Sequence, residues 1–258
     1  MTIPDDSRRF HRLTGVQVPR SARPTVLLDL DDTLFDHTHS SLAGLTALQE
    51  RFVELGRVSL DQLAKIHAKN LEAMHDLVLV GELSLDEARF ARFRALAADV
   101  GAPSLDPEEL VVSYRDAYQG ARRAVPGAAE LLLALRGRAT VAVVTNNVVA
   151  EQIDKLVRLH MKDLVDVLVI SEEAGVRKPD PAIFHLALAR CGASADDAVM
   201  IGDSWGSDVL GARAAGVRAV WLNRAGRHCP APAACTEIQS LLPTQSVLEL
   251  LLGAGAAP

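Results

Sequence analysis

The sequence predicts an α/β protein with a doubly wound, parallel, Rossmann-like sheet and four helices inserted after its first strand. From residue 125 onward, short apolar runs alternate with amphipathic segments, a pattern typical of parallel strands joined by right-handed helical crossovers. Residues 37–123, in contrast, show helical periodicity and no strand-like run. A chain of 258 residues is long enough for a large core with a smaller inserted domain.

The first strand is predicted over residues 25–28, where β-branched and apolar residues indicate a buried parallel strand, and it leads directly into Asp29, Asp31 and Asp32. Asp is disfavoured in strands and costly to bury unpaired, so we expect these carboxylates at the carboxyl edge of the sheet, where open α/β sheets hold ligands. Asp29 and Asp31 would face the same way and repel each other without a cation or a shared proton. The strand end therefore indicates a metal site, although one Asp could simply cap a turn or the next helix.

The inserted segment is predicted to contain four amphipathic helices in a small bundle. An apolar stripe ends near Gly56, and Ser59 is a plausible N-cap for a second helix. Ser84 and Glu87 have the spacing of a capping box that opens a third helix. A fourth is predicted over residues 107–120.

The remaining strands of the sheet are predicted over 139–144, 165–170, 198–201 and 217–222. Helices are expected between them, including one over 182–191 and one over 206–215. We therefore expect a Rossmann-like core over 24–36 and 124–252 and a helical cap domain over 37–123. A flexible leader over 1–23 and a tail over 253–258 complete the predicted organisation.

Composition excludes several classes of function. The net charge of −6 gives no basic footprint, so nucleic-acid binding has no support. No stretch approaches the roughly 20 apolar residues that span a bilayer, and the N-terminus lacks the apolar core of a secretory signal. Cys191, Cys229 and Cys235 form no metal-type spacing and fit reduced thiols in a cytoplasmic protein. We expect a monomer or a homodimer in the cytoplasm.

Polar side chains follow four predicted strands and should meet at one edge of the parallel sheet. They are Asp29 and Asp31, Thr145 and Asn146, Lys178 in the loop after the third strand, and Asp203 with Asp208. Carboxylate oxygens are the ligands that Mg²⁺ prefers, and a lysine supplies the charge that an anionic substrate needs. Amides that open a helix after Thr145 could bind phosphate oxygens.

Each of these residues also has a simpler interpretation. Lys178 could be a solvated loop lysine, Thr145 an N-cap, and Asp208 either a surface charge or a residue that supports the metal site. His37 and His39 have the spacing of a metal pair, but a hinge or surface position is favoured. Trp205 could face substrate or pack in the core, and His75 could lie in the core of the helical bundle.

Taken together, these motifs resemble those of the haloacid dehalogenase-like hydrolase superfamily. The four motifs correspond to Asp29-x-Asp31-x-Thr33, Thr145 in Val-Val-Thr-Asn, Lys178 in Val-Arg-Lys-Pro, and Gly-Asp203-Ser-x-x-x-Asp208. The helical insertion stands where that superfamily carries its C1 caps. Residues 28–35, 169–176 and 221–223 are similar to the pyrimidine 5′-nucleotidases of the superfamily, although Asn147 stands where their pattern has glycine.

The resemblance implies a phosphatase that acts through an aspartyl phosphate on Asp29. In such an enzyme Asp31 is the general acid and base, and Thr33 orients it. Asp29, the backbone carbonyl of Asp31, and Asp203 would hold Mg²⁺. Thr145, Asn146 and Lys178 would bind the phosphoryl oxygens, and Asp208 would support the site.

The substrate implied by the resemblance is a small phosphorylated metabolite, with a pyrimidine nucleoside monophosphate favoured. A sugar-phosphate phosphatase, a general phosphatase and a phosphomutase remain alternatives. A dehalogenase of the same fold needs neither a metal nor a leaving-group acid, so Asp31 and Asp203 argue against it. A non-catalytic binding protein should have lost a charged motif residue, and none is missing here.

Overall fold

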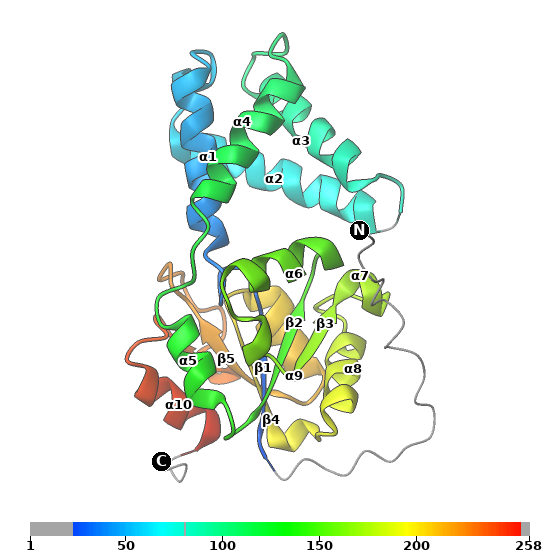
Figure 1. Ribbon diagram of the computed structural model, residues 1–258, viewed down its shortest axis with the longest axis vertical. Helices are drawn as coiled ribbons and strands as arrows, with labels where there is room; N and C mark the ends of the chain where they lie inside the picture. Colours follow the sequence, from blue (N-terminus) through cyan, green and yellow to red (C-terminus); the bar gives the residue numbers. More distant parts are fainter. Residues whose placement is uncertain (1–22, 80, 254–258) are drawn as a thin grey trace, which may run out of the picture.

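The computed structural model describes residues 23–79 and 81–253 (Figure 1). The predicted leader, apart from Arg23, and the predicted tail, apart from Gly253, lie outside the described residues. Within this part of the chain, no helix is long and apolar enough to cross a membrane.

The core is a six-stranded sheet with the order β3-β2-β1-β4-β5-β6, and every pair of neighbours is parallel. This arrangement confirms the predicted doubly wound sheet. Its sixth strand was not predicted, because three residues with an exposed Thr236 and Glu237 give no apolar run. The strands are β1 Thr25–Leu28, β2 Thr140–Thr145, β3 Val167–Ile170, β4 Ala198–Gly202, β5 Arg218–Leu222 and β6 Thr236–Ile238.

Helices cover both faces of the sheet, as the alternation of side chains along β1 requires. Val26 and Leu28 face a cluster with α5 Ala128–Leu135 and α10 Thr244–Leu252. Leu27 faces the opposite cluster, with α8 Pro181–Cys191 and α9 Gly211–Ala214. The remaining core helices are α6 Val149–Arg158 and α7 Ser171–Ala174. A π-helical turn spans Trp205–Leu210, and 3₁₀ turns span Leu55–Arg57, Lys162–Leu164, Ala195–Asp197 and Pro232–Ala234.

The four inserted helices are α1 His37–Arg51, α2 Leu60–Leu79, α3 Leu85–Asp99 and α4 Pro107–Gly120. They share an apolar cluster of their own and lie beyond the edge at which β1 and β2 end (Figure 1). The Ser84–Glu87 capping box is confirmed, and the hydroxyl of Ser59 accepts a hydrogen bond from Gln62 N. The first helix ends earlier than predicted, because the backbone at Phe52 is extended.

Two chain segments join this insertion to the core, and they lie side by side. Asp36 N donates to Arg123 O at 3.0 Å, and Val125 N donates to Leu34 O at 2.9 Å. The buried Asp36 carboxylate accepts hydrogen bonds from Arg123 Nε at 2.9 Å and from Arg224 Nη2 of the core at 3.1 Å. The entry and exit of the insertion are thus fixed to each other and to the loop after β5.

Candidate active site

A buried lysine joins two buried carboxylates at the carboxyl edge of the sheet. Asp29 follows β1, and its amide donates to Ile201 O of β4 at 3.0 Å. Lys178 Nζ lies 2.6 Å from Asp29 Oδ1 and 2.6 Å from Asp208 Oδ1. Burial alone would lower the pKa of Lys178, but these two carboxylates raise it, so the side chain stays an ammonium. Lys178 is therefore not a solvated loop lysine.

Asp203 completes an acidic group with a geometry suited to a metal ion. Oxygens of Asp29, Asp203 and Asp208 all lie within 4.8 Å of one another. Burial, followed by the charges of Asp208 and Asp32, raises the pKa of Asp203 to about 7. The pKa of Asp29 is also raised by burial, despite the contact with Lys178. Lys178 pairs with Asp29 and Asp208, while Asp203 has only the more distant Arg227 guanidinium at 3.5 Å. A divalent cation would therefore stabilise the ionised forms of the three carboxylates, and the oxygen donors fit Mg²⁺.

The short turn after β4 fixes Asp208 beneath the cluster. Asp208 lies in the π-helical turn, and its Oδ2 accepts a hydrogen bond from Ser204 N at 2.9 Å. A Cβ atom on Gly202 would come within 2.3 Å of that same oxygen. Glycine at the end of β4 therefore leaves the space that the Asp208 carboxylate occupies. From this position, the Asp208 carboxylate holds the Lys178 ammonium in place.

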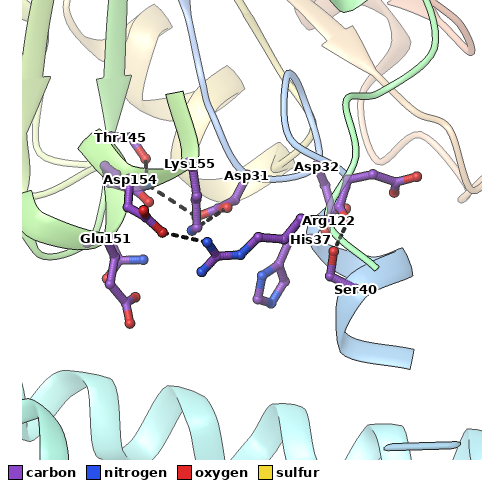
Figure 2. Close-up of polar contacts among 12 residues, drawn as sticks. Asp31, Asp32, His37, Ser40, Arg122, Thr145, Glu151, Asp154 and Lys155 are labelled. Atoms are coloured by element: carbon purple, nitrogen blue, oxygen red, sulfur yellow. Dashed lines mark hydrogen bonds and ion pairs between the residues drawn. The ribbon is translucent and has the colours of Figure 1, made fainter. Parts of the chain in front are cut away.

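Asp31 does not join the acidic group but forms a separate ion pair (Figure 2). Lys155 Nζ, from α6, lies 2.6 Å from Asp31 Oδ1 and 2.8 Å from Oδ2, and Gln152 Nε2 donates to Oδ2 at 3.2 Å. Burial would raise the pKa of Asp31, but the charges of Lys155 and His37 and the hydrogen bonds from Lys155 and Gln152 together lower it. The ion pair therefore favours the carboxylate form of Asp31 in this arrangement.

Thr145 and Asn146, at the end of β2, have different surroundings. The Thr145 hydroxyl oxygen accepts a hydrogen bond from Gln152 Nε2 at 2.6 Å, which leaves the hydroxyl proton to donate elsewhere. The Asn146 amide holds the main chain of Lys178: its Nδ2 donates to Lys178 O at 2.9 Å, and its Oδ1 accepts from Lys178 N at 2.8 Å. The side chain of Asn146 thus positions the lysine.

The amides that follow Asn146 are already bound within the protein. Asn147 N donates to Ser171 Oγ, Val148 N to Asn147 Oδ1, and Val149 N to Glu172 Oε2. These three amides are therefore not available to bind phosphate. Asn147 also has no positive φ, so the backbone does not require glycine at this position.

Lys155 and Gln152 are site residues that the sequence reasoning missed. Both lie on the buried face of α6 with Leu156. Polar residues three positions apart on the buried stripe of an amphipathic helix are the signal that could have identified them.

The other candidate residues are spread around the site. The hydroxyl of Thr33 donates to Asp29 Oδ2 at 3.3 Å, so it contacts the first Asp of the motif. His37 Nδ1 lies 3.0 Å from the Tyr118 hydroxyl, and its ring points toward the inserted helices (Figure 2). Trp205 packs edge-on against Trp221 in the core, with ring centroids 5.2 Å apart.

A cavity of about 630 Å³ lies between the sheet edge and the inserted helices. Its core side includes Asp31 and Lys155, and its insertion side includes His67, Arg92 and Tyr114. His75 also lines it, whereas His39 is absent from the lining found among the described residues. A molecule bound at the carboxylates would therefore contact the insertion.

Comparisons with known proteins agree with this geometry. A family model described as haloacid dehalogenase-like hydrolase matches residues 24–216. The chain is 36% identical over 200 residues to a ribulose-1,5-bisphosphate 5-phosphatase of Halopiger xanaduensis, covering 76% of this chain and 82% of the relative. It is 32% identical over 207 residues to the pyrimidine 5′-nucleotidase YjjG of Escherichia coli, covering 80% and 88%.

A solved structure of the putative hydrolase YfnB from Bacillus subtilis, bound to magnesium, has the same fold. Its TM-score is 0.67 at 24% identity, and the match covers 88% of this chain and 98% of that chain.

Proposed function

The chain belongs to the haloacid dehalogenase-like hydrolase family and is a phosphatase of small phosphorylated metabolites, and from that premise we propose a Mg²⁺-dependent reaction through an aspartyl phosphate on Asp29. The observation that carries the proposal is the buried Asp29–Lys178–Asp208 group with Asp203 beside it. A carboxylate held against an ammonium at a sheet edge is suited to attack an electrophile from a fixed position.

The reaction proceeds in two halves. A carboxylate oxygen of Asp29 forms a bond to phosphorus while the ester P–O bond breaks, and the leaving oxygen takes a proton from Asp31. A water then attacks the phosphorus of the aspartyl phosphate and gives a proton to Asp31, while the P–O bond to Asp29 breaks, so that inorganic phosphate and the Asp29 carboxylate are released.

Asp31 must carry a proton in the first half and lack it in the second. Its ion pair with Lys155 favours the carboxylate, which is the form that the second half uses. Lys155 therefore controls the fraction of the resting enzyme in which Asp31 carries the proton that the first half of the reaction needs. We assign Lys155 and Gln152 as positioning residues for Asp31.

The phosphoryl oxygens would bind Lys178 and the free hydroxyl proton of Thr145. Asn146 acts through the main chain of Lys178, and Thr33 through Asp29. Asp29, Asp203 and the backbone carbonyl of Asp31 would hold Mg²⁺, with Asp208 supporting them through Lys178. The ion, when bound, neutralises charge on the transferring group.

We propose that residues 37–123 form a cap domain that selects the substrate. The core groups recognise phosphate, which every substrate of this chemistry shares, so selection falls to the insertion side of the cavity. The similarity to YjjG supports a pyrimidine nucleoside monophosphate, and the similarity to the Halopiger enzyme supports a phosphorylated sugar. We place the reaction in the cytoplasm, in keeping with three unpaired cysteines.

Phosphate release from a panel of metabolites, with and without Mg²⁺, tests this function. The panel should include dUMP, ribulose 5-phosphate and p-nitrophenyl phosphate. EDTA should abolish release and added Mg²⁺ should restore it. Asp203→Asn should raise the Mg²⁺ concentration needed, whereas Asp196→Asn, an exposed aspartate outside the site, should behave as the wild type. Hydrolysis that is indifferent to EDTA would overturn the metal assignment.

A further inference from the structure

The insertion side of the cavity contains an arginine that lacks a hydrogen-bond or ion-pair partner among the described side chains. Arg92, on α3, lines the cavity, and its guanidinium forms neither an ion pair nor a hydrogen bond with any side chain that the structure describes. Its Nε atom is buried and unbonded. A buried hydrogen-bond donor without a partner is costly, and the cost is greater for a charged group. This position is therefore suited to bind an anion.

The other cations around the cavity already have carboxylate partners. Lys155 binds Asp31 at 2.6 Å. Arg89 binds Glu151 at 2.5 Å, and Arg122 binds Asp154 at 2.5 Å. The exposed Arg115 has Asp116 at 3.9 Å. Among the described residues that line the cavity, Arg92 is thus the arginine that forms no direct ion pair with a carboxylate, although the charge of Glu151, which is paired with Arg89, acts on it.

Aromatic rings hold the guanidinium of Arg92 in place. Its Cζ lies 4.7 Å from the centroid of the Phe93 ring and 5.5 Å from that of Tyr114. The same two rings contact His67, with centroids 5.7 Å and 4.9 Å from its ring. The ring of Phe93, on the same helix as Arg92, and the ring of Tyr114, on α4, therefore restrict both side chains, and less freedom is lost when a ligand binds.

His67 brings a second unpartnered group to the same place. Its side chain is 2% exposed, and its Nε2 has no hydrogen-bond partner. Burial, together with the charges of Arg92 and His37, lowers the pKa of His67 well below 6.5, so the ring is neutral. A neutral imidazole with its proton on Nε2 donates one hydrogen bond and adds no charge.

We propose that Arg92 and His67 form a subsite for a second anionic group of the substrate, a phosphate or a carboxylate remote from the phosphate that is hydrolysed. The inference rests on the proposed phosphatase function and narrows its substrate class. A guanidinium offers a planar pair of donors that matches either anion bidentately. A nucleoside monophosphate carries no second anion. The subsite therefore favours a sugar bisphosphate or a phosphorylated acid as the substrate.

Matched substrate pairs test the subsite. Ribulose 1,5-bisphosphate and ribulose 5-phosphate differ by a phosphate, and 3-phosphoglycerate and glycerol 3-phosphate differ by a carboxylate. In one of the two pairs, we expect the wild type to prefer the member with the second anion by at least about tenfold in kcat/KM. A preference in the first pair identifies the anion as a phosphate, and a preference in the second identifies it as a carboxylate. Arg92→Gln should reduce that ratio to near one, while Arg115→Gln, an exposed arginine on α4, should keep it.

Binding in EDTA separates this proposal from the phosphatase proposal. Calorimetric titration with the same four compounds needs no turnover, and the wild type should bind the preferred member at least about tenfold more tightly. If Arg92→Gln fails to fold, Arg92→Lys replaces it in the test. This variant keeps the charge but loses the planar donors, so it should retain only part of the preference for the second anion. Equal kcat/KM and equal affinity within both pairs, or a preference that survives both Arg92 variants, would overturn the subsite. Selective binding without hydrolysis of any compound would overturn the phosphatase proposal alone.

Discussion

Asp29 and Asp31 lie two residues apart in the chain, yet their surroundings shift their pKa values in opposite directions. Burial, with the charges of Asp208 and Asp203, raises the pKa of Asp29, whereas Lys155, together with His37 and Gln152, lowers that of Asp31 despite burial. Two carboxylates with different environments can take different roles in one reaction. In our proposal the first attacks phosphorus and the second transfers protons.

Lys155→Met tests the coupling of Asp31 to α6. Removing the ammonium takes away the largest of the effects that oppose burial, so the pKa of Asp31 should rise. The first half needs protonated Asp31, so the fall of kcat/KM at alkaline pH should move to higher pH for an alkyl phosphate. p-Nitrophenyl phosphate, whose leaving group needs little protonation, should show a smaller shift.

The pH profiles of wild type and variant, measured with both substrates, make this comparison. Lys162→Met is the matched control, because Lys162 is exposed and lies outside the site. An alkaline limb that stays in place with the alkyl phosphate would show that Lys155 does not tune Asp31.

Motif spacing predicted the carboxylates and Lys178 but not their partners. Asp29, Lys178 and Asp208 belong to three segments that a parallel sheet must bring to one edge, so their convergence follows from topology. The pairing of Asp31 with Lys155 depends on how α6 packs over that edge, which spacing alone does not define. The backbone amides of Val148 and Val149 donate hydrogen bonds to the side chains of Asn147 and Glu172. The sequence does not show these bonds, so it could not show that the amides are unavailable to phosphate.

At the scale of elements, the site depends on how β4 ends. The strand ends at Gly202, and the π-helical turn that follows contains Asp208. The Asp208 carboxylate occupies the space that a Cβ atom on residue 202 would need. The apolar run of this strand is continuous and predicts its bounds within one residue. The turn was interpreted as an ordinary helix over 206–215, because helical periodicity does not distinguish a π-helical turn from an α-helix.

Gly202→Ala should disturb both stability and activity. The new methyl group would meet Asp208 Oδ2 at 2.3 Å and its Cγ at 2.4 Å, so the carboxylate that holds Lys178 must move. Overpacking of this kind costs about 1–3 kcal/mol in the free energy of unfolding. We expect a lower melting temperature together with a lower kcat on p-nitrophenyl phosphate.

Gly120→Ala provides the matched control for this variant. No atom lies within 4 Å of the position that its Cβ would occupy, at the end of α4. Its melting temperature and kcat should remain close to those of the wild type. If Gly202→Ala behaves in the same way, the position of Asp208 does not depend on glycine.

At the scale of the whole molecule, the predicted sheet is confirmed and the insertion lies over its active edge (Figure 1). The change from helical periodicity to alternating strands and helices predicts the division of the chain into a core and an inserted domain, and that division stays a prediction. The sequence could not show how the insertion faces the core, because that depends on contacts such as Asp36 with Arg123 and Arg224. Arg92 and His67 could not be identified from the sequence, because their place in the cavity also depends on how the insertion faces the core.

The central claim is that Asp29 attacks phosphorus, and covalent labelling of the enzyme tests it most directly. Wild type mixed with a ³²P-labelled substrate and quenched in acid should carry label on the peptide that contains Asp29, and hydroxylamine should release it. Asp29→Asn keeps the size of the side chain but removes the attacking carboxylate. It should carry no label and lose about a thousandfold or more in kcat, with an unchanged circular dichroism spectrum. Undiminished turnover by Asp29→Asn, or label on a different residue, would contradict the account.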